Sequence, residues 1–136
     1  KKKFELTYPK DDETLYFIDL DGRIQFFNND IYNLEVCYPQ GELFYIEGEA
    51  KAVSRERKLL FKLHQWAKEK NDGWEPDWEE DEEKKWYVYY NHVEERLNVT
   101  WGYNSTNFIK LPYFKTEELA QECIELFGDE IKEVLA

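Results

Sequence analysis

Short apolar runs separated by turn residues mark the first part of the chain. Residues 15–20 and 23–27 are mostly apolar, and Asp21 and Gly22 separate the two runs. An Asp-Gly pair in this position is typical of a β-hairpin with a type I′ turn, because both central residues of that turn need a positive φ. The pattern therefore predicts an antiparallel hairpin.

The next segment changes from strand-like to helical periodicity. Strands are predicted over residues 34–38 and 43–46. From about residue 48 to residue 70, apolar residues recur every three or four positions, which predicts a long helix. Its apolar stripe consists of Ala50, Val53, Leu60, Phe61 and Ala67, widened by Leu59, Leu63 and Trp66. Because the stripe is wide, we expect this helix to be buried on more than one side.

The second half repeats the order of elements. Its predicted strands are residues 85–90, 96–103 and 108–114. Thr116 is a good N-cap for a helix, and Gly128 is a residue type that often ends one. We therefore expect a helix between these two residues and a short final helix capped by Asp129.

The two halves align with each other at an offset of about 70 residues. Residues 16–21 lie over residues 86–91, and the pattern Phe44, Glu47, Ala50 lies over Phe114, Glu117, Ala120. The sequence thus predicts an α+β protein made of two similar strand–strand–helix halves. Antiparallel sheets would accompany a long central helix and short C-terminal helices. The expected segments are residues 1–70, a connector at 71–85 and residues 86–136, within one compact domain.

Charge narrows the possible partners. The chain of 136 residues has 30 acidic and 18 basic side chains, a net charge of -12. Direct binding of nucleic acid is not expected, because it depends on a basic surface. No apolar run approaches the ~18 residues needed to span a bilayer, and no export signal is visible. We expect a cytoplasmic protein without membrane contact, whose partner is basic.

Asp19 is the first candidate for chemistry. Together with Asp21 it resembles the first motif of haloacid-dehalogenase-type phosphatases, in which the first Asp is the nucleophile and the second the general acid. That family has Thr after the Gly, whereas this chain has Arg23. Its doubly wound parallel sheet also does not match a short chain of antiparallel pattern. We therefore interpret Asp19 as a residue of the hairpin turn.

Other catalytic and metal-binding patterns are weak. His64, His92, Cys37 and Cys123 have no paired spacing of the kind that zinc sites use. The two cysteines are a single pair in a chain that looks intracellular, which favours two buried thiols over a disulfide, and their apolar surroundings do not favour a catalytic nucleophile. We expect no enzyme activity, no metal and no cofactor.

The connector between the halves has the most unusual composition. From Glu69 to Glu83 it contains nine acidic residues and one base, and Trp74 and Trp78 flank Pro76. Two interpretations stay open: a solvated linker pinned to the core by its two Trp side chains, or a docking surface for a basic partner. The candidate docking residues are Trp74, Asp77, Trp78, Glu79, Glu80, Asp81, Glu82 and Glu83. Glu118, Glu122 and Glu125, spaced by four and three on one face of the C-terminal helix, are added to this set.

Three stretches of the chain resemble a known group of proteins. They are the Trp-Glu-Pro-Asp-Trp connector, the aromatic run at residues 84–91, and the Tyr-Phe-Lys-Thr-Glu-Glu-Leu-Ala helix start at 113–120. Together they resemble small accessory proteins encoded by phages and prophages of Gram-positive bacteria. The resemblance covers residues 71–130, and more loosely 15–70. It implies a phage-borne protein in the bacterial cytoplasm, and it carries over no catalytic residues.

The expected function combines this context with the charge. Small acidic phage proteins often inhibit host nucleic-acid enzymes, as some anti-restriction and anti-CRISPR proteins do. The first hypothesis is a non-catalytic inhibitor that occupies the basic channel of a nucleic-acid-processing or defence enzyme, such as a CRISPR nuclease, by imitating DNA. The alternative is an accessory module that binds another phage protein through aromatic surface, with the acids serving solubility.

Overall fold

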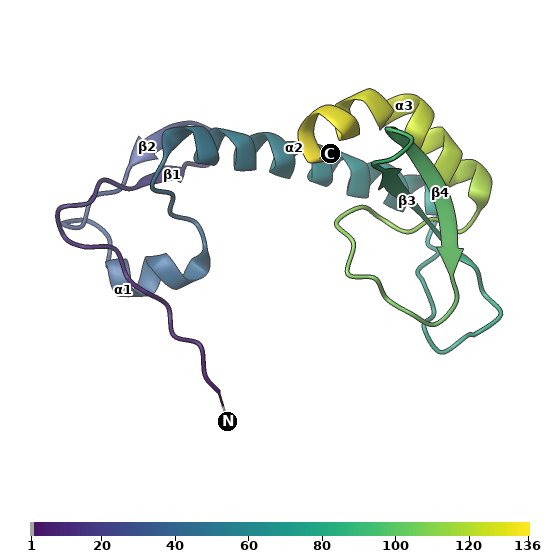
Figure 1. Cartoon of the computed structure of the whole chain (residues 1–136), viewed down its shortest axis with the longest axis horizontal. Helices are drawn as coiled ribbons and strands as arrows, with labels where there is room; N and C mark the ends of the chain where they lie inside the picture. Colours follow the sequence, from purple (N-terminus) through teal and green to yellow (C-terminus); the bar gives the residue numbers. More distant parts are fainter. Residues whose placement is uncertain (1) are drawn as a thin grey trace. The chain divides into compact units, whose positions relative to one another are not determined.

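The computed structural model describes residues 2–136 and has the α+β class that the sequence predicts. Two small antiparallel sheets are combined with helices (Figure 1). The chain forms two compact units, Lys1–Arg55 and Glu56–Ala136, so that the boundary falls within the long helix α2 (Glu47–Asn71). This boundary differs from the predicted segment ends at residues 70 and 85.

The first unit contains the predicted hairpin. Strands β1 (Tyr16–Ile18) and β2 (Ile24–Phe26) pair antiparallel, so the hairpin is confirmed. Its turn type was predicted wrongly. The Gly22 N–H donates to the Asp19 carbonyl at 2.9 Å, and Gly22, with φ 81°, is the only residue of the turn with a positive φ. This is a type I turn followed by a glycine bulge, which needs only one such residue.

The predicted strand at residues 34–38 is wrong. This segment forms a short helix α1 (Leu34–Cys37), followed by the 3₁₀ turn η1 (Tyr38–Gln40). The Asn33 side chain caps α1 by accepting from the Glu35 N–H at 2.9 Å. This cap stabilises the start of a helix, although the apolar pattern of the segment predicts a strand.

Helix α2 confirms the predicted long helix and ends where turn residues follow it. Asp72 and Gly73 have φ values of 48° and 84°. The Asn71 side chain joins the helix end to the segment before α3 (Glu117–Leu135), since its Nδ2 donates to the Tyr113 carbonyl at 2.9 Å. Its Oδ1 accepts from the Lys115 N–H at 3.1 Å.

The second unit contains the larger hairpin, made of β3 (Lys85–Asn91) and β4 (Arg96–Gly102), as predicted. The strand predicted at 108–114 is wrong. Of that segment only Phe114 pairs with the sheet, through an isolated bridge to Trp86. Leu111 and Phe114 of this segment pack individually against the hydrophobic core, whereas Phe108 is exposed.

Helix α3 has the predicted start but not the predicted end. The Thr116 hydroxyl caps it by accepting from the Leu119 N–H at 3.2 Å. The helix continues through Gly128 to Leu135, so the predicted stop and the separate final helix at Asp129 are both wrong. Gly128 is buried, and a Cβ there would lie 3.6 Å from Leu97 Cδ1 of β4. At this residue α3 therefore packs directly on the hairpin.

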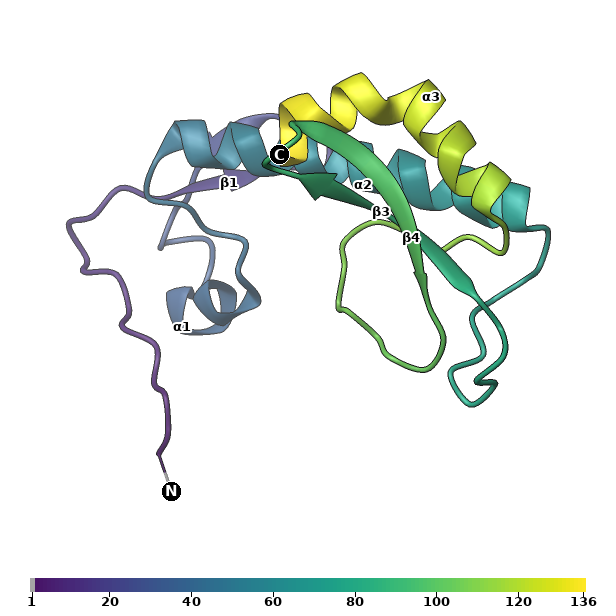
Figure 2. The same cartoon turned by 45° about the vertical axis from the view of Figure 1, so that its right-hand side comes forward.

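The core of the second unit lies where α2, α3 and the β3–β4 hairpin meet (Figure 2). Its buried members are Leu59, Leu63, Ala67, Val88, Phe114, Ala120, Cys123 and Ile131. Trp66 of α2 packs against α3 and against the segment before it. The centre of its ring lies 5.6 Å from that of Phe127 and 5.7 Å from that of Phe114. The second half of α2 is thus an integral part of this unit.

The predicted internal repeat has a structural counterpart at an offset of 70 residues. Tyr16 and Phe44 exchange backbone hydrogen bonds of 2.8 and 2.9 Å, and Trp86 and Phe114 do the same at 3.0 and 2.7 Å. In each half the helix then begins three residues after the Phe, and the equivalent residues Ala50 and Ala120 are fully buried. Both halves therefore build the same hairpin–bridge–helix arrangement.

Candidate acidic site and an apolar pocket

The acidic connector is folded around one buried lysine. Lys85, at the start of β3, is 0% exposed. Its Nζ donates to the carbonyls of Glu80 at 2.9 Å and Glu83 at 3.1 Å, and lies 3.5 Å from Glu83 Oε1. The same Nζ lies 5.3 Å from the centre of the Trp78 ring. A buried ammonium group needs such partners, so it holds the connector in one conformation.

Glu83 is the second internal fixing point of the connector. Its Oε1 accepts from the Asp77 N–H at 2.9 Å, and its Oε2 accepts from Trp74 Nε1 at 3.3 Å. With the Lys85 contact, both carboxylate oxygens are engaged within the chain. Glu83 therefore organises the loop, and its carboxylate is not free for a partner as those of its exposed neighbours are.

The two connector Trp residues differ in their surroundings. Trp78 packs edge-on against Tyr113, with ring centres 5.0 Å apart, and Tyr113 packs in turn against Tyr87 of β3. Trp78 is thus an anchor of the connector on the hairpin. Trp74 is half-buried and lines an open hollow of about 530 Å³ together with Lys68 of α2.

Five predicted docking carboxylates point to solvent from this fixed loop. They are Asp77, Glu79, Glu80, Asp81 and Glu82, all of them exposed. Two of them also define the local turns. Asp77 Oδ1 accepts from the Glu79 N–H at 3.1 Å, and Glu80 Oε1 accepts from the Glu82 N–H at 3.2 Å. The carboxylates therefore project from a loop that has hydrogen bonds of its own.

The predicted helical stripe lies on a different element from the connector. Glu118 and Glu125 are exposed, and Glu122 Oε1 is 4.0 Å from Lys70 Nζ of α2. Val88 of β3 packs into the core under α3, whereas Lys85 contacts the connector. Because alternate strand residues face opposite sides, Val88 and Lys85 place the core under α3 and the connector contacts on opposite faces of the hairpin. The acids of α3 and those of the connector thus lie on different elements, and Glu122 comes close to Lys70, which precedes the connector.

Asp19 has the turn role that the sequence suggests. Its Oδ1 accepts from the N–H groups of Asp21 and Arg23, each at 2.9 Å, and its Oδ2 accepts from Gln25 Nε2 at 3.0 Å. The hydrogen bond from Gln25, followed by that from the Arg23 backbone, lowers the pKa of Asp19. These bonds stabilise the carboxylate and the hairpin turn together.

The remaining candidates for chemistry have structural surroundings. Both cysteines are free thiols: Cys123 is buried, as predicted, but Cys37 is only half-buried. Burial raises the pKa of Cys123 to about 12. His64 Nε2 donates to the Lys110 carbonyl at 2.8 Å. Within residues 2–136, no group of three or more His, Cys, Asp or Glu side chains could hold a metal ion.

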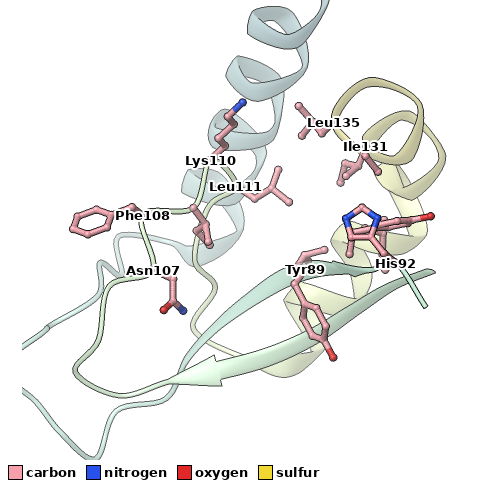
Figure 3. A pocket seen from close by; sticks show the side chains of 13 residues that line it. Tyr89, His92, Asn107, Phe108, Lys110, Leu111, Ile131 and Leu135 are labelled. Carbon is pink, nitrogen blue, oxygen red and sulfur yellow. The ribbon is translucent and has the colours of Figure 1, made fainter. Parts of the chain in front are cut away.

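An open apolar pocket of about 420 Å³ was missed by the sequence analysis (Figure 3). It lies between the hairpin, the end of α3 and the loop after β4, with Leu111, Ile131 and Leu135 among its walls. Phe108 lies at its edge with φ 51° and a side chain that is 93% exposed. Three segments far apart in sequence form the pocket, so no local pattern could have revealed it.

No protein-family model matches this chain, and no curated protein or solved structure matches it either. None of the helices in the described part of the chain is long and apolar enough to cross a membrane.

Proposed function

We propose that the protein is a non-catalytic binding protein that captures a basic partner through the acidic connector. The observation that carries the proposal is the fixing of the connector by Lys85, which is fully buried and bonded to two connector carbonyls. Fixed carboxylates lose little conformational freedom on binding, and this preorganisation favours affinity. The α3 stripe, on a different element, serves as a secondary acidic surface.

A nucleic-acid-processing enzyme of the bacterial host suits this surface best. Such enzymes have basic channels for phosphate groups, and a net charge of -12 accelerates encounter with them. Neighbouring carboxylates on a rigid loop would occupy the channel as phosphates do. The resemblance to phage accessory proteins supports this proposal, in which the protein acts in the cytoplasm of an infected cell. Inhibition of a defence nuclease is the corresponding role.

The test is capture from a host lysate at low salt with elution by a salt gradient. The deciding variant replaces Glu79, Glu80 and Glu82 by Gln and Asp81 by Asn. It keeps Glu83, because Glu83 holds the loop internally. We expect the unmodified protein to retain a DNA- or RNA-processing enzyme that moderate salt releases, and the variant to lose it.

A matched control removes the same number of charges from the first unit. In it, Glu5 is replaced by Gln and three exposed aspartates, Asp11, Asp12 and Asp21, by Asn. The control should capture the enzyme as the unmodified protein does. Equal loss in both variants would show that total charge alone matters, and retention by the connector variant would contradict the proposal.

A second candidate function is supported by the exposed aromatic surface of the second hairpin. Trp101 is 44% and Tyr103 is 39% exposed, and Lys84 Nζ lies 4.8 Å from the Trp101 ring centre. An accessory module that binds another phage protein would use such side chains as anchors. Its capture would respond little to salt and would be lost in a Trp101→Ala variant.

A further inference from the structure

The apolar pocket of the second unit has the properties of a binding site. Its volume of about 420 Å³ lies within the range of roughly 300–1,000 Å³ that is usual for ligand sites. Leu111, Ile131 and Leu135 come together around it from the loop and from α3 (Figure 3). It opens to solvent on the second unit, away from the connector residues that carry the proposed function.

Phe108 gives this surface a protrusion beside its hollow. Its ring is turned away from the pocket that its backbone helps to line (Figure 3). A non-glycine residue with a positive φ is strained, and an aromatic ring that is 93% exposed loses the benefit of burial. Both costs are offset if another molecule covers the ring.

The shape of this surface indicates that the molecule covering Phe108 is a second copy of the same chain. A surface with an apolar protrusion next to an apolar hollow matches a copy of itself after a two-fold rotation, so that each protrusion enters the other hollow. Charge favours the same occupant. In a chain with 30 acidic residues, no Asp or Glu side chain lines this pocket, and its ionisable side chains are Tyr89, Tyr90, His92 and Lys110. Lys110 is itself paired with Glu56, and Ala136 also lines the pocket. Two acidic chains can therefore meet here without bringing Asp or Glu side chains together in the pocket.

The geometry points to a symmetric homodimer in which Phe108 of each copy fills the apolar pocket of the other. This inference goes beyond the proposed function and concerns a different surface. Each pocket remains incomplete until a second chain supplies its Phe108. Because the contact is small, we expect a dissociation constant on the order of 10–100 μM.

Analytical ultracentrifugation from about 5 μM to about 1 mM brackets this affinity and tests the inference. The unmodified chain should change from monomer to dimer and no further. Raising the salt concentration should leave the dimer intact or strengthen it, because it screens the repulsion between two acidic chains. Phe108→Ser removes both protrusions of the dimer and should weaken association roughly a hundredfold.

Two further variants test whether the dimer depends on the contact between Phe108 and the pocket or on another exposed apolar residue. Phe61→Ser removes another exposed Phe, one on α2 that does not line the pocket, and should leave the dimer unchanged. Leu135→Trp fills the pocket from the end of α3 and should abolish the dimer while circular dichroism shows the fold intact. A mixture of the Phe108→Ser and Leu135→Trp chains retains one good protrusion and one open pocket, so it should form heterodimers.

Several results would overturn the inference. They are a monomer throughout the concentration range, a dimer that Phe108→Ser does not weaken, and a mixture that does not associate. Association of the unmodified chain beyond the dimer would point to a head-to-tail contact and would also contradict the two-fold arrangement. Capture of a basic enzyme by the connector is independent of every one of these outcomes.

Discussion

Lys85 determines the conformation of the connector at the scale of a single side chain. The equivalent residue of the first half, 70 positions earlier, is the buried Leu15. A leucine at this place would fill the space but donate no hydrogen bonds. The lysine instead binds two carbonyls and the Glu83 carboxylate, so the position joins an acidic loop to an apolar core.

Lys85→Leu should therefore loosen the connector while the core remains. We expect a loss of about 2 kcal/mol in the free energy of unfolding, below the value for a fully buried pair, because Glu83 keeps some water contact. Urea unfolding measures this loss, and a Glu-specific protease should cut within residues 79–83 faster than in the unmodified chain. Lys84→Leu, at an exposed position, should cost less than about 1 kcal/mol. Equal protection from the protease in both variants would contradict the role of Lys85.

The two thiols should differ sharply in reactivity. Burial raises the pKa of Cys123 from its ordinary value of 9.0 to about 12, so its thiolate fraction at pH 8 is roughly 10⁻⁴. Iodoacetamide at pH 8 should label half-buried Cys37 and spare Cys123 until urea unfolds the chain. Mass spectrometry of the peptides gives the result. Rapid labelling of Cys123 in the folded protein would show that the α2–α3 contact opens readily.

The same pKa shift predicts how stability depends on pH. The folded state holds the Cys123 proton to a higher pH than the unfolded chain does. Its contribution is therefore complete below pH 9.0 and is lost as the pH rises from there toward about 12. A Cys123→Ala variant should show a smaller decline in the free energy of unfolding over the accessible part of this range.

At the scale of elements, the sequence predicts an element correctly where a single residue determines the local backbone conformation. The hairpin follows from Gly22, and the start of α3 follows from the Thr116 cap. Residues 34–38 and 108–114 were predicted as strands from their apolar residues but form none. The Asn33 cap begins a short helix in the first segment, and only Phe114 of the second pairs with a strand. How much of a segment pairs with a strand depends on tertiary structure, which the pattern within the segment does not reveal.

Gly128 also shows that a local sequence pattern can predict the wrong structure, and substitutions at this residue test its role in packing. A glycine near the end of an apolar stripe suggests a helix stop, whereas this one lies inside α3 and packs on the hairpin. A Cβ there would lie 3.4 Å from Ile124 Cγ2 and 3.6 Å from Leu97 Cδ1, which leaves room for one methyl group.

Gly128→Ala should therefore raise the free energy of unfolding by up to about 1 kcal/mol through helix propensity. Gly128→Leu should lower it by roughly 1–3 kcal/mol through overpacking. Gly22→Ala, at a positive φ, is the control and should destabilise the hairpin by about 1 kcal/mol. Urea unfolding measures whether each substitution raises or lowers the free energy of unfolding. Destabilisation by Gly128→Ala would support the predicted helix stop instead.

At the scale of the whole molecule, the repeated order of elements seen in the sequence is also present in the structure. Both halves build a hairpin, a bridging Phe and a helix at the same spacing. The candidate site was only partly predictable. The density of acids is visible in the sequence, but the inward orientation of Glu83 and Trp78 depends on the tertiary position of Lys85.

The role of α2 in the second unit leads to a prediction about fragments. A fragment of residues 56–136 contains every member of the buried cluster, and we expect it to unfold cooperatively on heating. A fragment of residues 71–136, cut near the predicted segment end at residue 70, lacks Leu59, Leu63, Trp66 and Ala67. Phe114 and Cys123, both fully buried in the chain, would then face water. Each such side chain forfeits roughly 1.5–3 kcal/mol of burial, which exceeds what a small unit can spare.

Far-ultraviolet circular dichroism and thermal unfolding of the two fragments decide between these boundaries. The longer fragment should keep its helices and show a single transition, and the shorter one should show neither. Leu63→Asp in the longer fragment is the matched control, because it buries a charge at a position that is 0% exposed. It should reproduce the unfolded state of the shorter fragment. A shorter fragment that folds as well as the longer one would mean that α3 and the hairpin are sufficient by themselves and that α2 only covers them.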